Sequence, residues 1–200
     1  MKYPPPYHQD HDKNHMIEVI KNYPLATVIS VKDNSPFITH LPLIYREEDQ
    51  KLIGHIDIYN PQTPLLKDNN EVTIIFEGPQ CYISPSVYRT TQLPTWNYIK
   101  VHLKGIVKAI ESKDALKESL IKMTEFLEQP DHKYVLEPDN PRMDHFVNYI
   151  EMFEIEITNW EGKFKLSQDK TKTDTRLAKE ELIRANQQSI EAFLARVFNE

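Results

Sequence analysis

Hydrogen-bonding and aromatic side chains gather in four short stretches of this sequence, each at the end of a predicted strand. The stretches are GHIDIYNPQ (54–62), FEGPQCYISPS (76–86), PTWNY (94–98) and GKFKLSQ (162–168). Ligand pockets combine mostly apolar walls with a few placed amide, hydroxyl, imidazole or ammonium groups. Four such stretches in one short chain therefore predict a ligand pocket built from strand ends.

In the last of these stretches, Lys165 and Ser167 are the residues best suited to hold an anion. Lysine supplies a point positive charge and serine a hydroxyl group, a combination that suits a phosphate monoester. The alternative is a solvated loop that follows a strand. The other stretches also have structural alternatives. Asn60-Pro61 can simply start a turn, and Trp96 can cover a barrel end with its indole N–H bonded to a carbonyl.

Several common kinds of site have no support in the sequence. No G-x-S-x-G, G-x-G-x-x-G or Walker motif occurs, and with four glycines a phosphate cradle of backbone amides is not expected. The single cysteine, Cys81, excludes an intrachain disulfide and is expected to be a small buried hydrophobe. For His8, His11 and His15 we favour a mobile, solvated arm over a metal site. No catalytic residue is assigned.

The elements that must position these stretches change from strands to helices along the chain. Asp12 caps a predicted short helix that ends before Tyr23-Pro24. Alternating or β-branched segments predict strands over residues 25–31, 37–43, 51–56, 71–76, 80–84, 99–110 and 152–157. Their hairpin-like spacing favours a closed antiparallel barrel or a sandwich. Helices are predicted over residues 112–129, from Asn140-Pro141, and over residues 173–198.

The chain has 200 residues and a formal net charge of −6. We expect one domain over residues 1–168, followed by a hinge and an amphipathic helix over 169–200 that packs on the same domain or on a partner subunit. The negative charge argues against non-specific attraction to DNA. The sequence has no signal-peptide run and no apolar stretch near the ~20 residues of a membrane span, so we expect a cytoplasmic protein without a membrane partner.

The four stretches resemble sequence blocks of the PaiB-type family of FMN-binding transcriptional regulators. THLPL (39–43) and the opening MKYPPPY fit the same family, and the resemblance reaches about Gln168. It implies an α+β fold with a mostly β core: an antiparallel split β-barrel with flanking helices and a C-terminal helix. It also implies a homodimer with FMN at the subunit interface, its phosphate held by basic and hydroxyl side chains.

The resemblance assigns residues of each block to the flavin site. They are Thr39 and His40 from THLP, His55, Asn60 and Gln62 from the GH…NPQ block, Trp96 and Asn97 from PTWNY, and Lys165, Ser167 and Gln168 from KLSQ. In this interpretation Trp96 is a wall of a groove at the dimer interface and Asn97 is a hydrogen-bonding group. The alternative is that PTWNY only packs the dimer.

Asp57 and Ile58 depart from the family pattern, which has a small residue and then a basic or aromatic one there. If Asp57 faces the phosphate, two unit charges ~4 Å apart repel by about 4 kcal/mol at intermediate dielectric. That is about half of the ~8 kcal/mol behind micromolar affinity, so FMN binding would be weak or lost.

Three functions therefore stay open. They are an FMN-binding regulator of the PaiB type, a flavin-dependent oxidoreductase, and a divergent dimer that has lost FMN. The resemblance allows DNA as a partner, but the sequence contains no helix-turn-helix with a basic recognition helix.

Overall fold

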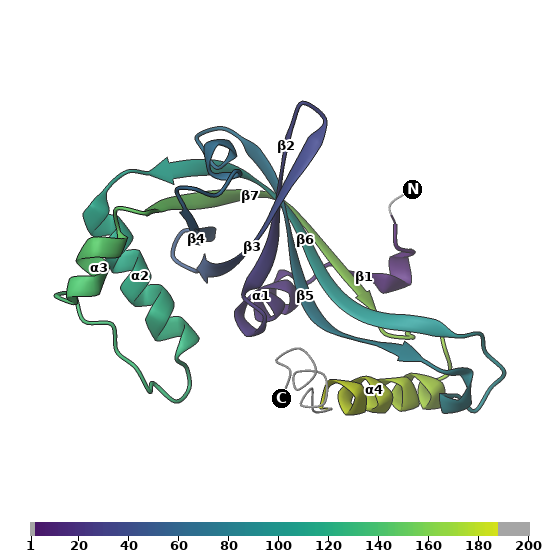
Figure 1. Cartoon of the computed structure of the whole chain (residues 1–200). Coiled ribbons are helices and arrows are strands. Elements are labelled where there is room, and N and C mark those ends of the chain that lie inside the picture. The colour runs from purple at the N-terminus through teal and green to yellow at the C-terminus, as the bar shows by residue number, and fades with distance from the viewer. Residues whose placement is uncertain (1–2, 188–200) are drawn as a thin grey trace, which may run out of the picture. The chain divides into compact units, whose positions relative to one another are not determined.

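The computed structural model describes residues 3–187, which contain seven strands and four α-helices (Figure 1). The strands are β1 (Gln9–Asp10), β2 (Leu25–Lys32), β3 (Ser35–Arg46), β4 (Lys51–Asp57), β5 (Glu71–Ile83), β6 (Thr95–Ile110) and β7 (Ile150–Lys165). The helices are α1 (Lys13–Asn22), α2 (Lys113–Leu127), α3 (Pro141–Phe146) and α4 (Lys172–Asn186). Short 3-10 turns are η1 (Pro6–His8), η2 (Thr63–Leu65) and η3 (Pro85–Val87).

The strands form one mostly antiparallel sheet that closes on itself. Their order is β1-β7-β4-β3-β2-β5-β6, and β6 pairs in addition with β7. The strands from β7 round to β6 therefore make a ring, and a ring leaves no free edge except where strands overhang. The predicted closed barrel with a mostly β core is confirmed.

The internal contacts of the chain divide it into two compact units. The barrel unit consists of residues 12–77 and 101–161. The terminal unit, within the described residues, consists of 3–11, 78–100 and 162–187. Strands β5, β6 and β7 each contribute residues to both units.

The barrel unit has its apolar residues in the pattern that a curved sheet requires. Along β2, Ala26 and Val28 are fully buried while their neighbours are not, which is the period of two of a strand with one buried face. Helices α2 and α3 cover part of the sheet, with Leu116 and Met143 packed in one cluster with Ile53 of β4. Both helices begin where predicted, because the side chains of Ser112 and Asn140 accept backbone N–H groups of their first turns.

The terminal unit holds α4 against the end of β5. Ala178 and Leu182 of α4 pack with Cys81 and Ile83 of β5. The buried carboxylate of Asp174 accepts hydrogen bonds from the Arg89 backbone N–H, at 2.6 Å, and from the Thr90 hydroxyl. The predicted burial of Cys81 is confirmed, since 7% of the residue is exposed.

The largest differences from the predicted strands are in β5, β6 and β7. Strand β5 continues through Gly78-Pro79, where two strands were predicted. Gly78 allows close packing there rather than a turn, because a Cβ at this position would lie 3.1 Å from Ile99 Cγ2. Strand β6 starts at Thr95 instead of Ile99, and β7 runs over Ile150–Lys165 instead of 152–157.

The two ends of the chain also differ from what the sequence predicts. The prediction of a mobile, solvated N-terminal arm is wrong, because Gln9 and Asp10 pair with Lys163 and Gly162 of β7. The predicted C-terminal helix begins at Lys172, and Ile190, Phe193, Leu194 and Val197 of its apolar stripe lie outside the described residues. Over residues 3–187, no helix is long and apolar enough to cross a membrane.

Gly105→Ala tests the packing between β6 and β7. A Cβ at Gly105 would lie 2.8 Å from the Glu156 carbonyl oxygen and would also collide with the Ile155 side chain. We expect a loss of about 1–3 kcal/mol in the free energy of unfolding, measured by urea denaturation, because a backbone atom cannot move aside cheaply. Lys108→Ala, at an exposed position of the same strand, is the control and should change stability by less than about 0.5 kcal/mol.

Candidate functional site

The residues assigned to the flavin site fall in both units. Trp96, Asn97, Lys165, Ser167 and Gln168 belong to the terminal unit. Thr39, His40, His55, Asn60 and Gln62 belong to the barrel unit. Each group has its own hydrogen-bond network.

Ser167 is the centre of the network in the terminal unit. Its hydroxyl donates to Asn97 Oδ1 at 3.1 Å and lies 2.8 Å from the hydroxyl of Tyr88. Only 1% of Asn97 and 2% of Ser167 is exposed, so the solvated-loop alternative for this serine is wrong. The backbone of Ser167 has φ of 62°, a left-handed conformation that costs energy in a residue other than glycine.

The amide nitrogen of Asn97 is the unusual atom of this network. Asn97 Nδ2 is buried, and within the described residues it has no hydrogen-bond partner. A buried donor that is left unsatisfied costs about 1–3 kcal/mol. Native proteins retain few such groups, and they are often explained by a ligand or by function.

A cavity of about 380 Å³ adjoins this network and carries a positive charge. Lys165, Lys170, Thr95 and Ser167 are among the residues that line it. The Lys165 ammonium donates to the Thr95 hydroxyl at 2.7 Å, a neutral partner that does not cancel its charge. The Lys170 ammonium pairs instead with Asp169, also at 2.7 Å, and this pairing lowers the pKa of Asp169 against the effect of its burial.

Gln168 holds the N-terminal segment against the end of β7. Its Oε1 lies 2.8 Å from His8 Nδ1 and accepts the Leu166 backbone N–H at 2.7 Å. His8 is 6% exposed, so this histidine is structural in the terminal unit.

Trp96 does not share in the buried network. It lies within β6, where alternation turns its ring away from the side of buried Asn97. The ring is 49% exposed and its centroid lies 6.4 Å from that of Tyr82, which is equally exposed. The two rings form an exposed aromatic pair on neighbouring strands β5 and β6.

Asn60 organises the second group, in the barrel unit. Its Oδ1 accepts the Gln62 backbone N–H at 2.8 Å, and its amide nitrogen donates to the Thr39 hydroxyl at 3.2 Å. The Gln62 side chain is buried and donates to the Ser30 hydroxyl at 2.9 Å and to the Val28 carbonyl at 3.2 Å. Gln62 Oε1 is a buried acceptor with no partner in the described residues. The predicted turn at Asn60-Pro61 is thus confirmed, and the Gln62 that follows it carries an unsatisfied acceptor.

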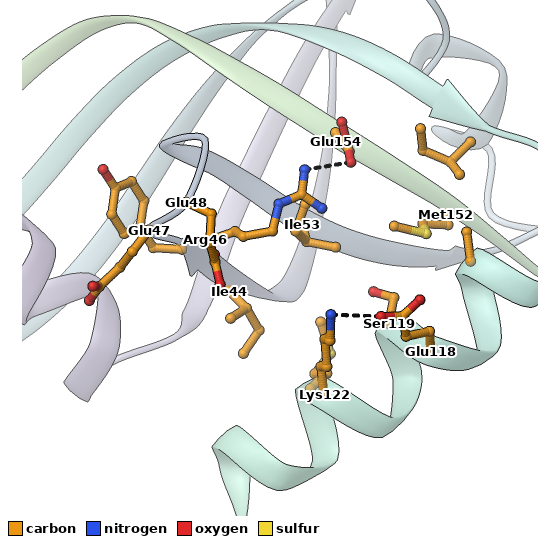
Figure 2. A pocket seen from close by; sticks show the side chains of 14 residues that line it. Ile44, Arg46, Glu47, Glu48, Ile53, Glu118, Ser119, Lys122, Met152 and Glu154 are labelled. Atoms are coloured by element: carbon orange, nitrogen blue, oxygen red, sulfur yellow. Dashed lines mark hydrogen bonds and ion pairs between the residues drawn. The ribbon is translucent and has the colours of Figure 1, made fainter. Parts of the chain in front are cut away.

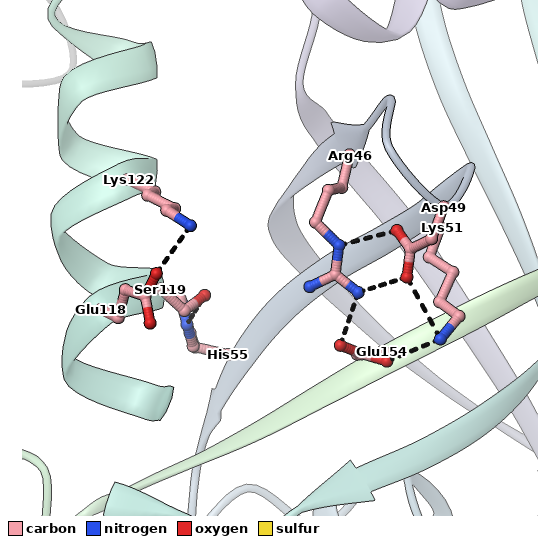
Figure 3. Close-up of polar contacts among 8 residues, drawn as sticks. All are labelled: Arg46, Asp49, Lys51, His55, Glu118, Ser119, Lys122 and Glu154. Carbon is pink, nitrogen blue, oxygen red and sulfur yellow. Dashed lines mark hydrogen bonds and ion pairs between the residues drawn. The ribbon is translucent and has the colours of Figure 1, made fainter. Parts of the chain in front are cut away.

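The two assigned histidines occupy different surroundings. His40 lies on an exposed part of β3, with its Nδ1 3.1 Å from the Thr27 hydroxyl of β2. His55 is a residue of β4 and its side chain is enclosed by α2, where its Nε2 lies 3.0 Å from the Ser119 hydroxyl (Figure 3). Burial lowers the pKa of His55 from 6.5 to about 4, so its imidazole is neutral at physiological pH.

Asp57 is exposed, and its carboxylate binds within its own turn. Its Oδ1 accepts the Tyr59 backbone N–H at 2.7 Å. The hydroxyl of Thr63 donates to the Asp57 carbonyl at 2.7 Å. Both residues therefore have structural partners in the GH…NPQ stretch.

Sequence reasoning did not assign four residues that the networks contain: His8, Tyr88, Thr95 and Lys170. Thr95 stands in the PTWNY stretch, so its position was a usable signal. Tyr88, by contrast, follows a short 3-10 turn and has no sequence feature that points to Ser167, which is 79 positions away.

A family model described as "Putative FMN-binding domain" matches residues 2–159. The chain belongs to this family. The match covers more than half of the sequence, including the stretches at residues 39–43, 54–62 and 94–98.

One relative is similar to this chain in sequence, and solved structures are similar to it in fold. "Protease synthase and sporulation protein PAI 2" of Bacillus subtilis is 27% identical over 175 residues, 86% of this chain and 84% of that protein. The FAD and heme binding protein of Mycobacterium smegmatis has a TM-score of 0.64 at 19% identity, covering 79% of this chain and 73% of that one. The flavocytochrome Anf3 of Azotobacter vinelandii has a TM-score of 0.62 at 16% identity, covering 79% and 69%. The predicted family and split-barrel fold are confirmed.

The pKa of His55 predicts an acid-dependent loss of stability. The folded protein favours the neutral imidazole, since the folded pKa of about 4 lies below the ordinary 6.5. This contribution is fully present above pH 6.5 and is lost as the pH falls toward 4, and the difference corresponds to about 3 kcal/mol.

His55→Gln should flatten the fall of the unfolding free energy between pH 7 and pH 4, measured by urea denaturation at each pH. His40→Gln is the matched control, because it changes an exposed histidine and keeps His55. Equal pH dependence in His55→Gln and the unmodified protein would show that His55 does not cause the loss.

Proposed function

We propose that this protein binds FMN as a homodimer and that the cavity of the terminal unit holds the FMN phosphate. The observation that carries the proposal is the unsatisfied Asn97 Nδ2, which belongs to the same buried network as Ser167 at the cavity wall. Membership of the family supports FMN as the ligand. Two structural neighbours, one an FAD and heme binding protein and the other a flavocytochrome, support a flavin as the ligand.

The side chains around the cavity fit a phosphate group. The cavity lining includes two lysines and one aspartate, so it keeps a net positive charge beside the hydroxyls of Thr95 and Ser167. Lys165 has further N–H donors beyond the one that Thr95 accepts, and a lysine is a common phosphate ligand. Holding a phosphate by side chains in this way agrees with a chain that has four glycines.

Bound FMN would supply redox chemistry, and the residues of this chain would bind and orient it. In this proposal, Lys165 compensates the phosphate charge and Ser167 keeps Asn97 in place. His55 is neutral and enclosed under α2, so it does not serve as a proton donor near neutral pH. No residue is therefore assigned to a catalytic step.

An exposed apolar face on β2 and β3 supports self-association. Leu25, Val31 and Ile38 are 60%, 65% and 56% exposed. The register places Leu25 opposite Pro42, Ile29 opposite Ile38, and Val31 opposite Pro36, so these side chains share one outer face of the hairpin. The Thr27–His40 pair lies on the same face, between the Leu25–Pro42 and Ile29–Ile38 pairs. Exposed apolar residues gathered on one face often mark an interaction surface. We propose that a second copy of the chain covers this face.

The regulatory role that the family resemblance implies stays a prediction. With a net charge of −6, the chain has no general attraction to DNA phosphates, and α4 mixes Lys and Arg with Asp and Glu. Regulation through another protein agrees better with this charge than direct DNA contact does.

Lys165→Ala tests the phosphate site. We expect a ten- to hundredfold loss in FMN affinity, since a charge-assisted contact contributes about 1.5–3 kcal/mol. Riboflavin, which lacks the phosphate, should bind the variant and the unmodified protein equally. Titrations followed by flavin fluorescence measure both ligands.

Two control variants accompany this titration. Lys172→Ala removes an exposed lysine at the start of α4, and Asp57→Asn removes the carboxylate that departs from the family pattern. Both should keep FMN affinity within about twofold. The proposed site would be contradicted if Asp57→Asn bound FMN tenfold more tightly while Lys165→Ala left FMN affinity unchanged. That result would place the phosphate near Asp57.

Ile38→Glu tests the association face. A charge in the centre of an apolar interface is left unpaired and desolvated, so we expect a shift from dimer to monomer in sedimentation velocity. Lys108→Glu, at an exposed position of β6, is the control for a new carboxylate on a strand. A monomeric unmodified protein, or a dimer that Ile38→Glu leaves intact, would remove this face from the proposal.

A further inference from the structure

The barrel unit contains a second and larger cavity, of about 540 Å³, between α2 and strands β3, β4 and β7 (Figure 2). Its size falls in the range of small-molecule pockets, roughly 300–1,000 Å³. Ile44, Ile53, Met123 and Met152 give it apolar walls. Methionine adapts to ligands of different shape, because its unbranched side chain is flexible and polarisable.

Arg46 stands at one wall of this cavity in a fixed orientation (Figure 3). Its Nε and Nη2 donate to the two carboxylate oxygens of Asp49 at 2.7 and 2.6 Å, and Nη2 also donates to Glu154 at 2.7 Å. Its third nitrogen, Nη1, makes no hydrogen bond to any residue in 3–187 and points toward α2 (Figure 3). The guanidinium is therefore held in place with one pair of N–H donors left for another acceptor.

Lys122 faces the cavity from α2, on the opposite wall. Its ammonium pairs with Glu118 at 2.7 Å in the same helix and retains further N–H donors. Cations thus stand on both walls, with donors that the protein does not use fully.

Most carboxylates at this cavity already have cationic partners. Glu154 pairs with Arg46 and with Lys51, the latter at 3.1 Å, and Glu47 pairs with Lys21 at 2.5 Å. Glu118 pairs with Lys122, and Glu48 is exposed. The fixed, unused hydrogen-bonding group of the cavity is thus a donor, which selects a ligand with an acceptor.

We propose that this cavity binds an amphipathic monocarboxylate, with its apolar body among the isoleucines and methionines and its carboxylate between Arg46 Nη1 and Lys122. An arginine with free N–H donors is well suited to a carboxylate, and a second cation on the facing wall adds attraction. The proposal depends on residues of the barrel unit alone. It is independent of the phosphate site, whose residues lie in the terminal unit.

Calorimetric titration of the 200-residue chain tests the proposal, with octanoate as probe and octylamine as its matched opposite. The two probes share one apolar chain and differ in the sign of the head group. We expect octanoate to bind at least tenfold more tightly than octylamine, and equally well with or without saturating FMN. Equal binding of the two probes, tighter binding of the amine, no octanoate binding, or displacement of octanoate by FMN would each overturn the proposal.

Two variants locate the probe in this cavity. Lys122→Glu changes an exposed side chain and should weaken octanoate at least fivefold, whereas Lys133→Glu, the same charge change in an exposed loop, should keep it within twofold. Ala115→Phe fills the cavity and should abolish binding while FMN affinity stays unchanged. Circular dichroism checks that each variant is folded. Unchanged octanoate affinity in folded Lys122→Glu or Ala115→Phe would place the probe elsewhere and refute the assignment.

Discussion

Pairing along β7 is the interaction on which both candidate ligand sites depend. This strand pairs with β1, β4 and β6, so its residues contribute to the closure of the ring and to the attachment of the N-terminal segment. Because β7 is long, it contributes a residue to each candidate site. It carries Glu154, which orients Arg46, and its last residue is Lys165, the cation of the proposed phosphate site.

Buried polar atoms that lack a hydrogen-bond partner reduce the free energy of unfolding of this protein. A buried amide without a partner opposes folding, so it persists in a stable protein only if other interactions compensate for it. Asn97 and Gln62 hold the two buried side-chain atoms of this kind in the described residues, one a donor and one an acceptor. Both residues belong to the stretches that resemble the flavin-binding family. We interpret this agreement as the mark of a binding function, since a purely structural turn would not need an unsatisfied atom.

Electrostatics separates the two cavities as well. In the barrel unit, Arg46, Lys51, Asp49 and Glu154 neutralise one another, and the hydrogen bonds to Arg46 and Lys51 help to lower the pKa of Asp49 to about 2. Such a network orients a guanidinium more than it adds net charge. In the terminal unit, the hydroxyl of Thr95 is the one hydrogen-bond partner of the Lys165 ammonium within residues 3–187, so its charge is available to an anion. The barrel cavity therefore offers directional N–H donors to a carboxylate, and the cavity of the terminal unit offers an unneutralised positive charge to a phosphate.

The sequence by itself determined the class of fold, most element positions and the family. β-branched residues marked β2, alternation marked the middle of β7, and Asp12, Ser112 and Asn140-Pro141 marked three helix starts, because these signals depend on neighbours within a few residues. The resemblance of the PTWNY and KLSQ stretches to one family required only short motifs.

Only the tertiary structure decided how the residues of these motifs are used. It continued β5 through Gly78, where local chemistry predicts a turn, because Ile99 packs against that glycine. It placed His55 beneath α2 rather than in an open pocket, turned the ring of Trp96 away from Asn97, and joined Tyr88 to Ser167. It also created the Arg46 cavity from segments that no short motif connects. These outcomes depend on contacts between positions far apart in the chain, and burial and unsatisfied hydrogen bonds exist only once those contacts have formed.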